Sequence, residues 1–167
     1  KKYPQFEKII LMASRLTKEK NIPLAIEAMK EVVKKYPKAG LLIVGDGPEK
    51  EKLKAKRSTL NANIIFEDWT DDLASYYKTS DIFLLTSDYE GYGRTIIEAL
   101  VAGTPVVSTD VGYAREAGVV LTEHNASSIS EKIVDFFKDQ KKRSFEYEYK
   151  SKDEYLDKFR SQFSLGD

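Results

Sequence analysis

The stretch that decides the fold is residues 81–101, which read DIFLLTSDYEGYGRTIIEALV. It starts with a short apolar run at residues 82–85, and such a run predicts a buried strand. It ends with apolar side chains at the spacing of a helix, namely Ile96, Ile97, Leu100 and Val101. Gly91 and Gly93 fall between the two, so we predict a strand, a tight turn without Cβ atoms in the way, and a helix.

Two glutamates bracket this turn, Glu90 at its mouth and Glu98 inside the predicted helix. The first N–H groups of a helix lack internal partners and carry the positive end of its dipole, so they attract phosphate oxygens. Because helical side chains lean toward the N-terminus, Glu98 can reach back toward the turn. We predict a ligand site that holds hydroxyls at two points with phosphate between them. In the alternative, the glycines only make the turn and both glutamates are solvated.

Outward from this stretch, strand and helix signals alternate from residue 8 to about residue 138, which predicts βαβ units. Helices are expected between the strands, and Asn125 is expected to cap the one that follows the last strand. The fold class predicted is a Rossmann-like, doubly wound α/β fold with a mostly parallel sheet and helices on both faces. About six strands are expected, at residues 8–13, 41–44, 63–66, 82–85, 104–108 and 118–121.

Length and composition limit the organisation and the possible partners. A chain of 167 residues with 41% hydrophobic content predicts a single domain over 1–167, in which 139–167 forms a C-terminal helical extension. Lys plus Arg number 27, as do Asp plus Glu, so no bulk attraction to nucleic acid is expected. The absence of cysteine excludes disulfide and thiolate chemistry and favours a cytoplasmic location. No signal peptide or membrane-spanning run is expected.

Three loops at the carboxyl ends of strands are candidate ligand loops, at residues 14–20, 45–48 and 88–93. Arg15 and Lys20 flank the first loop, and their charges suit a diphosphate, although both could be ordinary surface cations. The second loop lacks the third glycine of a dinucleotide fingerprint. It predicts a turn capped by Asp46 or Gly47, with Pro48 in the first turn of a helix.

Other polar and aromatic residues carry weaker signals. Trp69 either stacks on a base or anchors its loop in the core. His124 has no Ser or Asp arrangement around it that would make it a catalytic base, so it is interpreted as a loop residue. The acidic residues form no recognisable metal cage, and the Asp71-Asp72 pair is expected to cap a helix.

Four motifs in order resemble one known family. They are SRLTKEK at 14–20, IVGDGP at 43–48, EGYGRTIIE at 90–98 and AGTPVVSTDVG at 102–112. Together they resemble the C-terminal, donor-binding domain of retaining GT-B glycosyltransferases, in particular family 4 of glycosyl transferases group 1, over roughly residues 8–138. The chain departs from the family pattern at Ser14, Tyr92, Arg94 and Tyr113.

The resemblance implies roles for particular residues. Arg15 and Lys20 would hold the donor diphosphate and stabilise its charge as the sugar leaves, while Glu90 would contact the sugar hydroxyls, and these three form the expected catalytic set. Glu98 would bind the ribose. The whole expected donor-binding set is Arg15, Lys20, Gly45, Trp69, Glu90, Gly91, Tyr92, Gly93, Arg94, Thr95 and Glu98.

The function implied is transfer of a hexosyl unit from a UDP-, GDP- or ADP-sugar to a glycan, lipid or other acceptor, without a metal or other cofactor. In this family the acceptor site lies on a separate N-terminal domain, which is expected to be missing here. The chain alone is therefore expected to bind donor without transferring it. Any membrane association, at the cytoplasmic face, would come through the missing half. The alternatives are a GT-B-shaped nucleotide-sugar epimerase and a non-catalytic interaction module.

Overall fold

The computed structural model describes residues 2–58 and 63–139, which fold around one six-stranded sheet in the order β3-β2-β1-β4-β5-β6. All neighbouring strands are parallel. The strands are β1 Lys8–Ala13, β2 Ala39–Val44, β3 Ile64–Glu67, β4 Ile82–Leu85, β5 Val106–Thr109 and β6 Val120–Thr122. The helices are η1 Lys18–Lys20, α1 Ile22–Lys35, α2 Lys50–Ser58, α3 Leu73–Thr79, α4 Arg94–Val101 and α5 Ala126–Lys138. The predicted doubly wound α/β fold is confirmed.

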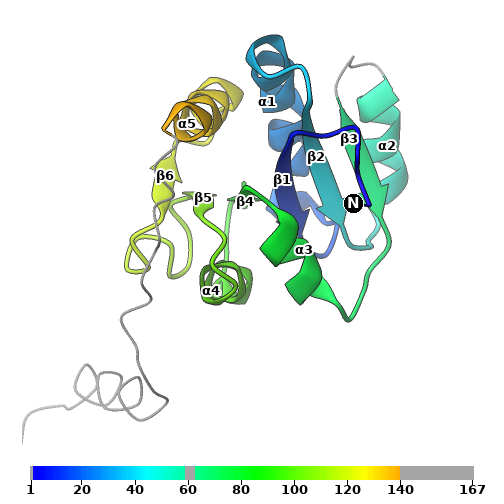
Figure 1. The fold of residues 1–167 in the computed structure, drawn as a ribbon. Coiled ribbons are helices and arrows are strands. Elements are labelled where there is room, and N and C mark those ends of the chain that lie inside the picture. Colours follow the sequence, from blue (N-terminus) through cyan, green and yellow to red (C-terminus); the bar gives the residue numbers. More distant parts are fainter. Residues whose placement is uncertain (1, 59–62, 140–167) are drawn as a thin grey trace, which may run out of the picture.

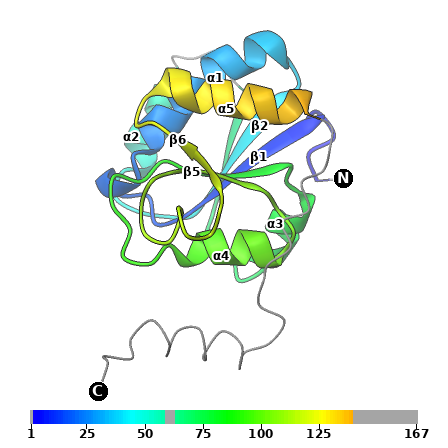
Figure 2. The ribbon, with the colours of Figure 1, turned by 90° about the vertical axis from the view of Figure 1, so that its left-hand side faces the viewer.

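Helices cover both faces of the sheet, with α1, α2 and α5 on one side and α3 and α4 on the other (Figures 1 and 2). Side chains of β1 alternate between the two resulting cores, since Ile10 packs in the first and Leu11 in the second. The central strands are therefore buried on both faces, which explains their nearly continuous apolar sequences.

The strand order reverses between β1 and β4, because the chain builds outward from β1 to β3 on one side and from β4 to β6 on the other (Figure 1). The loops that follow these two central strands consequently lie side by side. The backbone N–H of Asp88 donates to the carbonyl oxygen of Glu19 at 2.8 Å. In open α/β sheets such a switch point, at the carboxyl ends of the strands, is where ligands bind.

Several predicted boundaries are wrong by a few residues. The fifth strand begins at Val106, because the Thr104 hydroxyl donates to the carbonyl oxygen of Tyr77 and Thr104 thus belongs to a loop. Pro48 precedes α2 instead of lying in its first turn, since the next backbone N–H, that of Glu49, bonds to Leu16 in the loop after β1. Val101, one of the apolar residues at helical spacing, is the last residue of α4 and is 69% exposed.

Two of the three helix caps predicted from the sequence are confirmed. The third is wrong, because α2 begins at Lys50 and neither Asp46 nor Gly47 directly precedes it. The carboxylate of Asp72 accepts a hydrogen bond from the backbone of Ser75 at the start of α3. The side chain of Asn125 accepts one from the backbone of Ser128 at the start of α5. Each cap satisfies one of the N–H groups that the first turn of a helix leaves without a partner.

Replacing Gly45 with alanine is expected to lower the free energy of unfolding by about 3 kcal/mol or more. Gly45 has a φ of 145°, and a Cβ there would lie 2.0 Å from the carbonyl oxygen of Ser14. Gly103 is the matched control, because its φ of 80° is also unfavourable for alanine but no atom lies within 4 Å of a Cβ. For Gly103→Ala, chemical denaturation should show a loss of only about 1–2 kcal/mol in the free energy of unfolding. Equal losses at both positions would contradict the packing argument.

The C-terminal helical extension expected over 139–167 lies outside the described residues, except for Asp139. Within the described parts of the chain, every helix is too short or too polar to cross a lipid bilayer.

Candidate functional site

Two of the predicted site residues meet across the switch point. The Lys20 ammonium lies 2.7 Å from Oε1 of Glu90, and their side chains are only 18% and 13% exposed. The hydroxyl of Ser87 donates to the same carboxylate oxygen, also at 2.7 Å. A cation from the loop after β1 and a carboxylate from the loop after β4 thus form a sheltered ion pair.

The backbone that carries Lys20 is bound to the β4 loop by several contacts. The buried hydroxyl of Thr86 donates to the carbonyl oxygen of Lys20 at 2.9 Å. Asn21, the only described residue other than glycine with a positive φ, donates from its side chain to Asp88 at 2.8 Å. The left-handed conformation of Asn21 lets the chain turn from η1 into α1. Lys20 is therefore held on a defined backbone.

The turn into α4 has the form that the sequence predicted. Gly93 precedes the helix in a left-handed conformation, with a φ of 79°, and its carbonyl oxygen accepts from Ile96 at 2.9 Å. Gly91 is exposed, and a Cβ there would have no protein atom within 4 Å, so a ligand can approach this backbone. Arg94 and Thr95 form the first turn of α4, where backbone N–H groups lack helical partners.

A second loop supports this turn from the side. The N–H of Tyr113 donates to the carbonyl oxygen of Tyr92 at 3.0 Å, and the two rings stack with centroids 5.5 Å apart. A Cβ on Gly112 would lie 2.8 Å from the same carbonyl oxygen, so this close approach requires glycine. Tyr113, noted from the sequence only as a departure from the family, thus packs against the candidate loop.

Glu98 has a partner outside the Lys20–Glu90 pair. Its Oε2 accepts a hydrogen bond at 3.1 Å from the hydroxyl of Tyr77, which is on α3 and only 3% exposed. No hydrogen bond or ion pair among the described residues connects Glu98 with Lys20 or Glu90. The sequence placed Tyr77 only on the apolar face of its helix. The available signal was its hydroxyl, which needs a partner when the ring is buried.

Above about pH 10 we expect Tyr77 to make the stability of the fold pH-dependent. Burial raises the pKa of Tyr77 above its ordinary value, and the negative charge of Glu98 raises it further. The unfolded chain therefore loses this proton first, and stability falls as pH rises from about 10 toward the folded-state pKa, by up to about 1.4 kcal/mol per pH unit.

Chemical denaturation of the wild type and of Tyr77→Phe between pH 8 and pH 11 tests this expectation. The variant should show a shallower alkaline decline, because phenylalanine does not titrate. Tyr36→Phe is a control at a tyrosine that is less buried. Parallel declines in the wild type and in Tyr77→Phe would contradict the assignment.

The remaining predicted residues differ in their surroundings. Arg15 is exposed on the loop after β1, on the same loop as Lys20. Trp69 is 65% exposed between β3 and α3, so the alternative that it anchors its loop in the core is wrong. Gly45 is buried against the backbone of Ser14, a packing reason for glycine that the sequence did not reveal. His124 is a loop residue, with Nδ1 3.4 Å from the carboxylate of Asp88.

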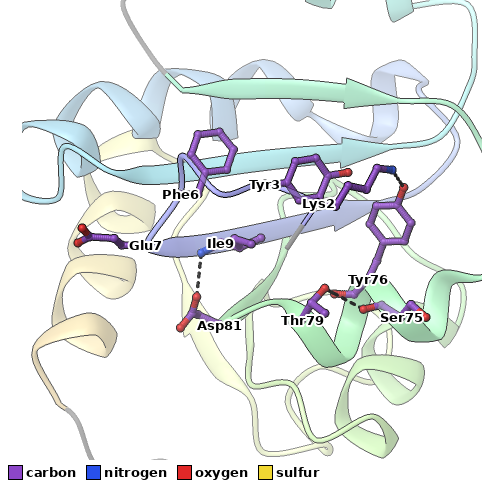
Figure 3. Close-up of a pocket in the computed structure, with 9 residues that line it drawn as sticks. All are labelled: Lys2, Tyr3, Phe6, Glu7, Ile9, Ser75, Tyr76, Thr79 and Asp81. Atoms are coloured by element: carbon purple, nitrogen blue, oxygen red, sulfur yellow. Dashed lines mark hydrogen bonds between the residues drawn. The ribbon is translucent and has the colours of Figure 1, made fainter.

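A pocket of about 450 Å³ lies elsewhere, at the amino ends of β1 and β4 (Figure 3). Its wall includes the rings of Tyr3, Phe6 and Tyr76, and Lys2 donates across it to the Tyr76 hydroxyl at 2.6 Å. Asp81, beside it, accepts from the backbone of Ile9 at 2.8 Å. None of the residues predicted for the ligand site lines this pocket.

The fold and the paired loops define the Rossmann-like C-terminal domain of a GT-B protein. The model of the family described as "Glycosyl transferases group 1" matches residues 2–153, and the chain belongs to this family. It is 32% identical over 139 residues to the poly(glycerol-phosphate) alpha-glucosyltransferase of Bacillus subtilis, a match that covers 78% of this chain and 21% of that protein. It is 37% identical over 106 residues to the alpha-monoglucosyldiacylglycerol synthase of Streptococcus pneumoniae, covering 61% of this chain and 24% of that protein.

Solved structures agree with this assignment. A crystal structure of a Staphylococcus aureus TarM mutant in complex with fondaparinux, alpha-GlcNAc-glycerol and UDP superposes with a TM-score of 0.79 at 28% identity. The match covers 96% of this chain and 36% of that one. The pneumococcal O-GlcNAc transferase GtfA in complex with UDP and GlcNAc gives a TM-score of 0.68 at 25% identity, covering 86% and 32%. The chain thus spans about a fifth to a third of such proteins.

Proposed function

We propose that this chain is the donor-binding domain of a retaining glycosyltransferase, which takes a hexosyl unit from a nucleotide-sugar. The contact between Lys20 and Glu90 at the switch point carries the proposal. A nucleotide-sugar has a negatively charged diphosphate next to a hydroxyl-rich ring, and this pair offers one group for each. Similarity to TarM, which was crystallised with UDP, supports a uridine nucleotide as the first donor to test.

In the proposed complex the phosphate and sugar contacts come from the two facing loops. Arg15 and Lys20 bind the diphosphate, and the backbone N–H groups at residues 91–95 bind the remaining phosphate and sugar oxygens. Glu90 accepts hydrogen bonds from the sugar hydroxyls, and Glu98 accepts them from the ribose. The exposed indole of Trp69, together with the loop at Gly45, borders the base.

The chemistry follows from the charge of the leaving group. As the bond between sugar and diphosphate breaks, negative charge grows on the leaving phosphate oxygen, and cations already in place stabilise it. Lys20 reaches this position by exchanging the carboxylate of Glu90 for the diphosphate. Removing one such contact raises the activation free energy by on the order of 3 kcal/mol. In this proposal protein cations supply the positive charge, and no metal ion is required.

The acceptor is proposed to bind a separate domain of a longer protein, because the chain spans only about a fifth to a quarter of the two sequence relatives described above. The chain alone should then bind donor without transferring the sugar. Calorimetric titration with UDP, GDP and ADP, and with their common sugars, tests the donor site. The proposal fails if none of these ligands binds at millimolar concentration while circular dichroism shows the chain to be folded.

A further inference from the structure

We infer that Ser87 is a positioning residue that holds Glu90 in place for the sugar, an inference that rests on the proposed function. Its hydroxyl lies 2.7 Å from Oε1 of Glu90 and donates to it. No motif in the sequence drew attention to this serine, which lies just before the candidate loop and is fully buried.

Glu90 uses one oxygen for both of its partners. Oε1 accepts from Lys20 and from Ser87, each at 2.7 Å, while the described residues give Oε2 no hydrogen bond. The carboxylate is thus anchored on its inner side, and its second oxygen is available for hydroxyls. In the ligand-free protein, two hydrogen-bond donors on one oxygen restrict the side chain to a narrow range of orientations.

The two anchors differ in what donor binding does to them. In the proposed complex the Lys20 ammonium turns to the diphosphate, so its contact with Glu90 weakens when the sugar must be oriented. Ser87 has no competing role there. Its hydroxyl is out of reach of solvent and can keep its hydrogen bond when the pair separates.

The backbone of Ser87 is itself held by the neighbouring strand β5. The hydroxyl of Thr109, at the end of β5, donates to the carbonyl oxygen of Ser87 at 2.7 Å, and both side chains are fully buried. The preceding Thr86 is held in the same way against the carbonyl oxygens of Lys20 and Asn21. Ser87 is therefore a rigid support, unlike a lysine with a long flexible side chain.

The test uses the ratio of the dissociation constants for a nucleoside diphosphate and for its nucleotide-sugar, measured by calorimetry on the whole chain. UDP with UDP-glucose and with UDP-N-acetylglucosamine are the probes. Ser87→Ala is expected to reduce the benefit of the sugar by about tenfold while leaving the affinity for UDP nearly unchanged, because a hydrogen bond to a charged group is lost at Glu90 alone. Ser87→Cys, almost the same size and a weak donor, should act in the same direction and guards against loss of folding.

Ser108→Ala is the matched control, since its hydroxyl is equally buried but donates to the carbonyl oxygen of Thr109, away from Glu90. It should leave the ratio unchanged. In a double-mutant cycle, Ser87→Ala should change the ratio little when Glu90→Ala is already present. The effects of two residues that act through one another are not additive.

An unchanged ratio in folded Ser87→Ala and Ser87→Cys would overturn the inference and leave the donor site standing. The inference would also be overturned if Ser87→Ala changed the ratio by the same factor in the wild type and in Glu90→Ala. A folded wild type that binds neither UDP nor its sugars would instead show that the proposed function is wrong.

Discussion

Replacing Lys20 with methionine is expected to weaken the binding of a nucleoside diphosphate by roughly 10- to 150-fold. Methionine keeps much of the length and apolar volume of the side chain but removes the ammonium. The proposed contact with the diphosphate is a charged hydrogen bond, and such bonds contribute about 1.5–3 kcal/mol. In the longer glycosyltransferase proposed above, the same change should lower kcat as well, because the leaving charge loses a stabilising cation.

The same variant should also destabilise the ligand-free fold. The Glu90 carboxylate is only 13% exposed and would lose its cation, leaving a poorly solvated charge. We expect the free energy of unfolding to fall by about 1–3 kcal/mol. Removing both partners in Lys20→Met/Glu90→Gln should restore much of this stability without restoring binding.

Lys18→Met is the matched control for both measurements. Lys18 lies two residues away in η1, and its side chain is exposed. Calorimetry and chemical denaturation of this control should match the wild type. Binding of UDP by folded Lys20→Met with the affinity of the wild type would remove Lys20 from the donor site.

The sequence predicted the architecture well because the strands are buried on both faces and their apolar runs are unambiguous, as at residues 82–85. The edges of the elements were less predictable. Thr104 and Pro105 suit a strand by position, yet Thr104 bonds to Tyr77, a residue distant in the sequence. Such a tertiary contact leaves no trace in local periodicity.

In the candidate site, too, the sequence predicted local features but not the tertiary contacts. Spacing and turn chemistry drew attention to Glu90 and Lys20, but only the strand order places them in contact. Ser87 and Tyr77, which bond to the two glutamates, were missed because their roles depend on a single hydroxyl atom. A motif therefore indicates the residues that could meet a ligand more readily than those that orient them.

Glu98→Ala and Glu90→Ala are expected to divide the binding energy of a nucleotide-sugar between its two halves. Glu98 bonds to Tyr77 and has no described contact with Lys20, so its loss should leave the Lys20–Glu90 pair intact. Because Glu98 binds the ribose in the proposed complex, Glu98→Ala should lower the affinities for UDP and for UDP-sugar alike, by roughly 10- to 150-fold.

Glu90→Ala should affect the two ligands differently. It removes the carboxylate that competes with the diphosphate for Lys20, so UDP should bind as well as before or more tightly. The added affinity from the sugar should be lost, because no acceptor remains for its hydroxyls at this position. Glu131→Ala, at an exposed position in α5, is the control and should change neither ligand. Calorimetric titration of UDP and UDP-glucose into the three variants distinguishes these patterns, and equal losses of both ligands in Glu90→Ala would show that Glu90 does not act on the sugar.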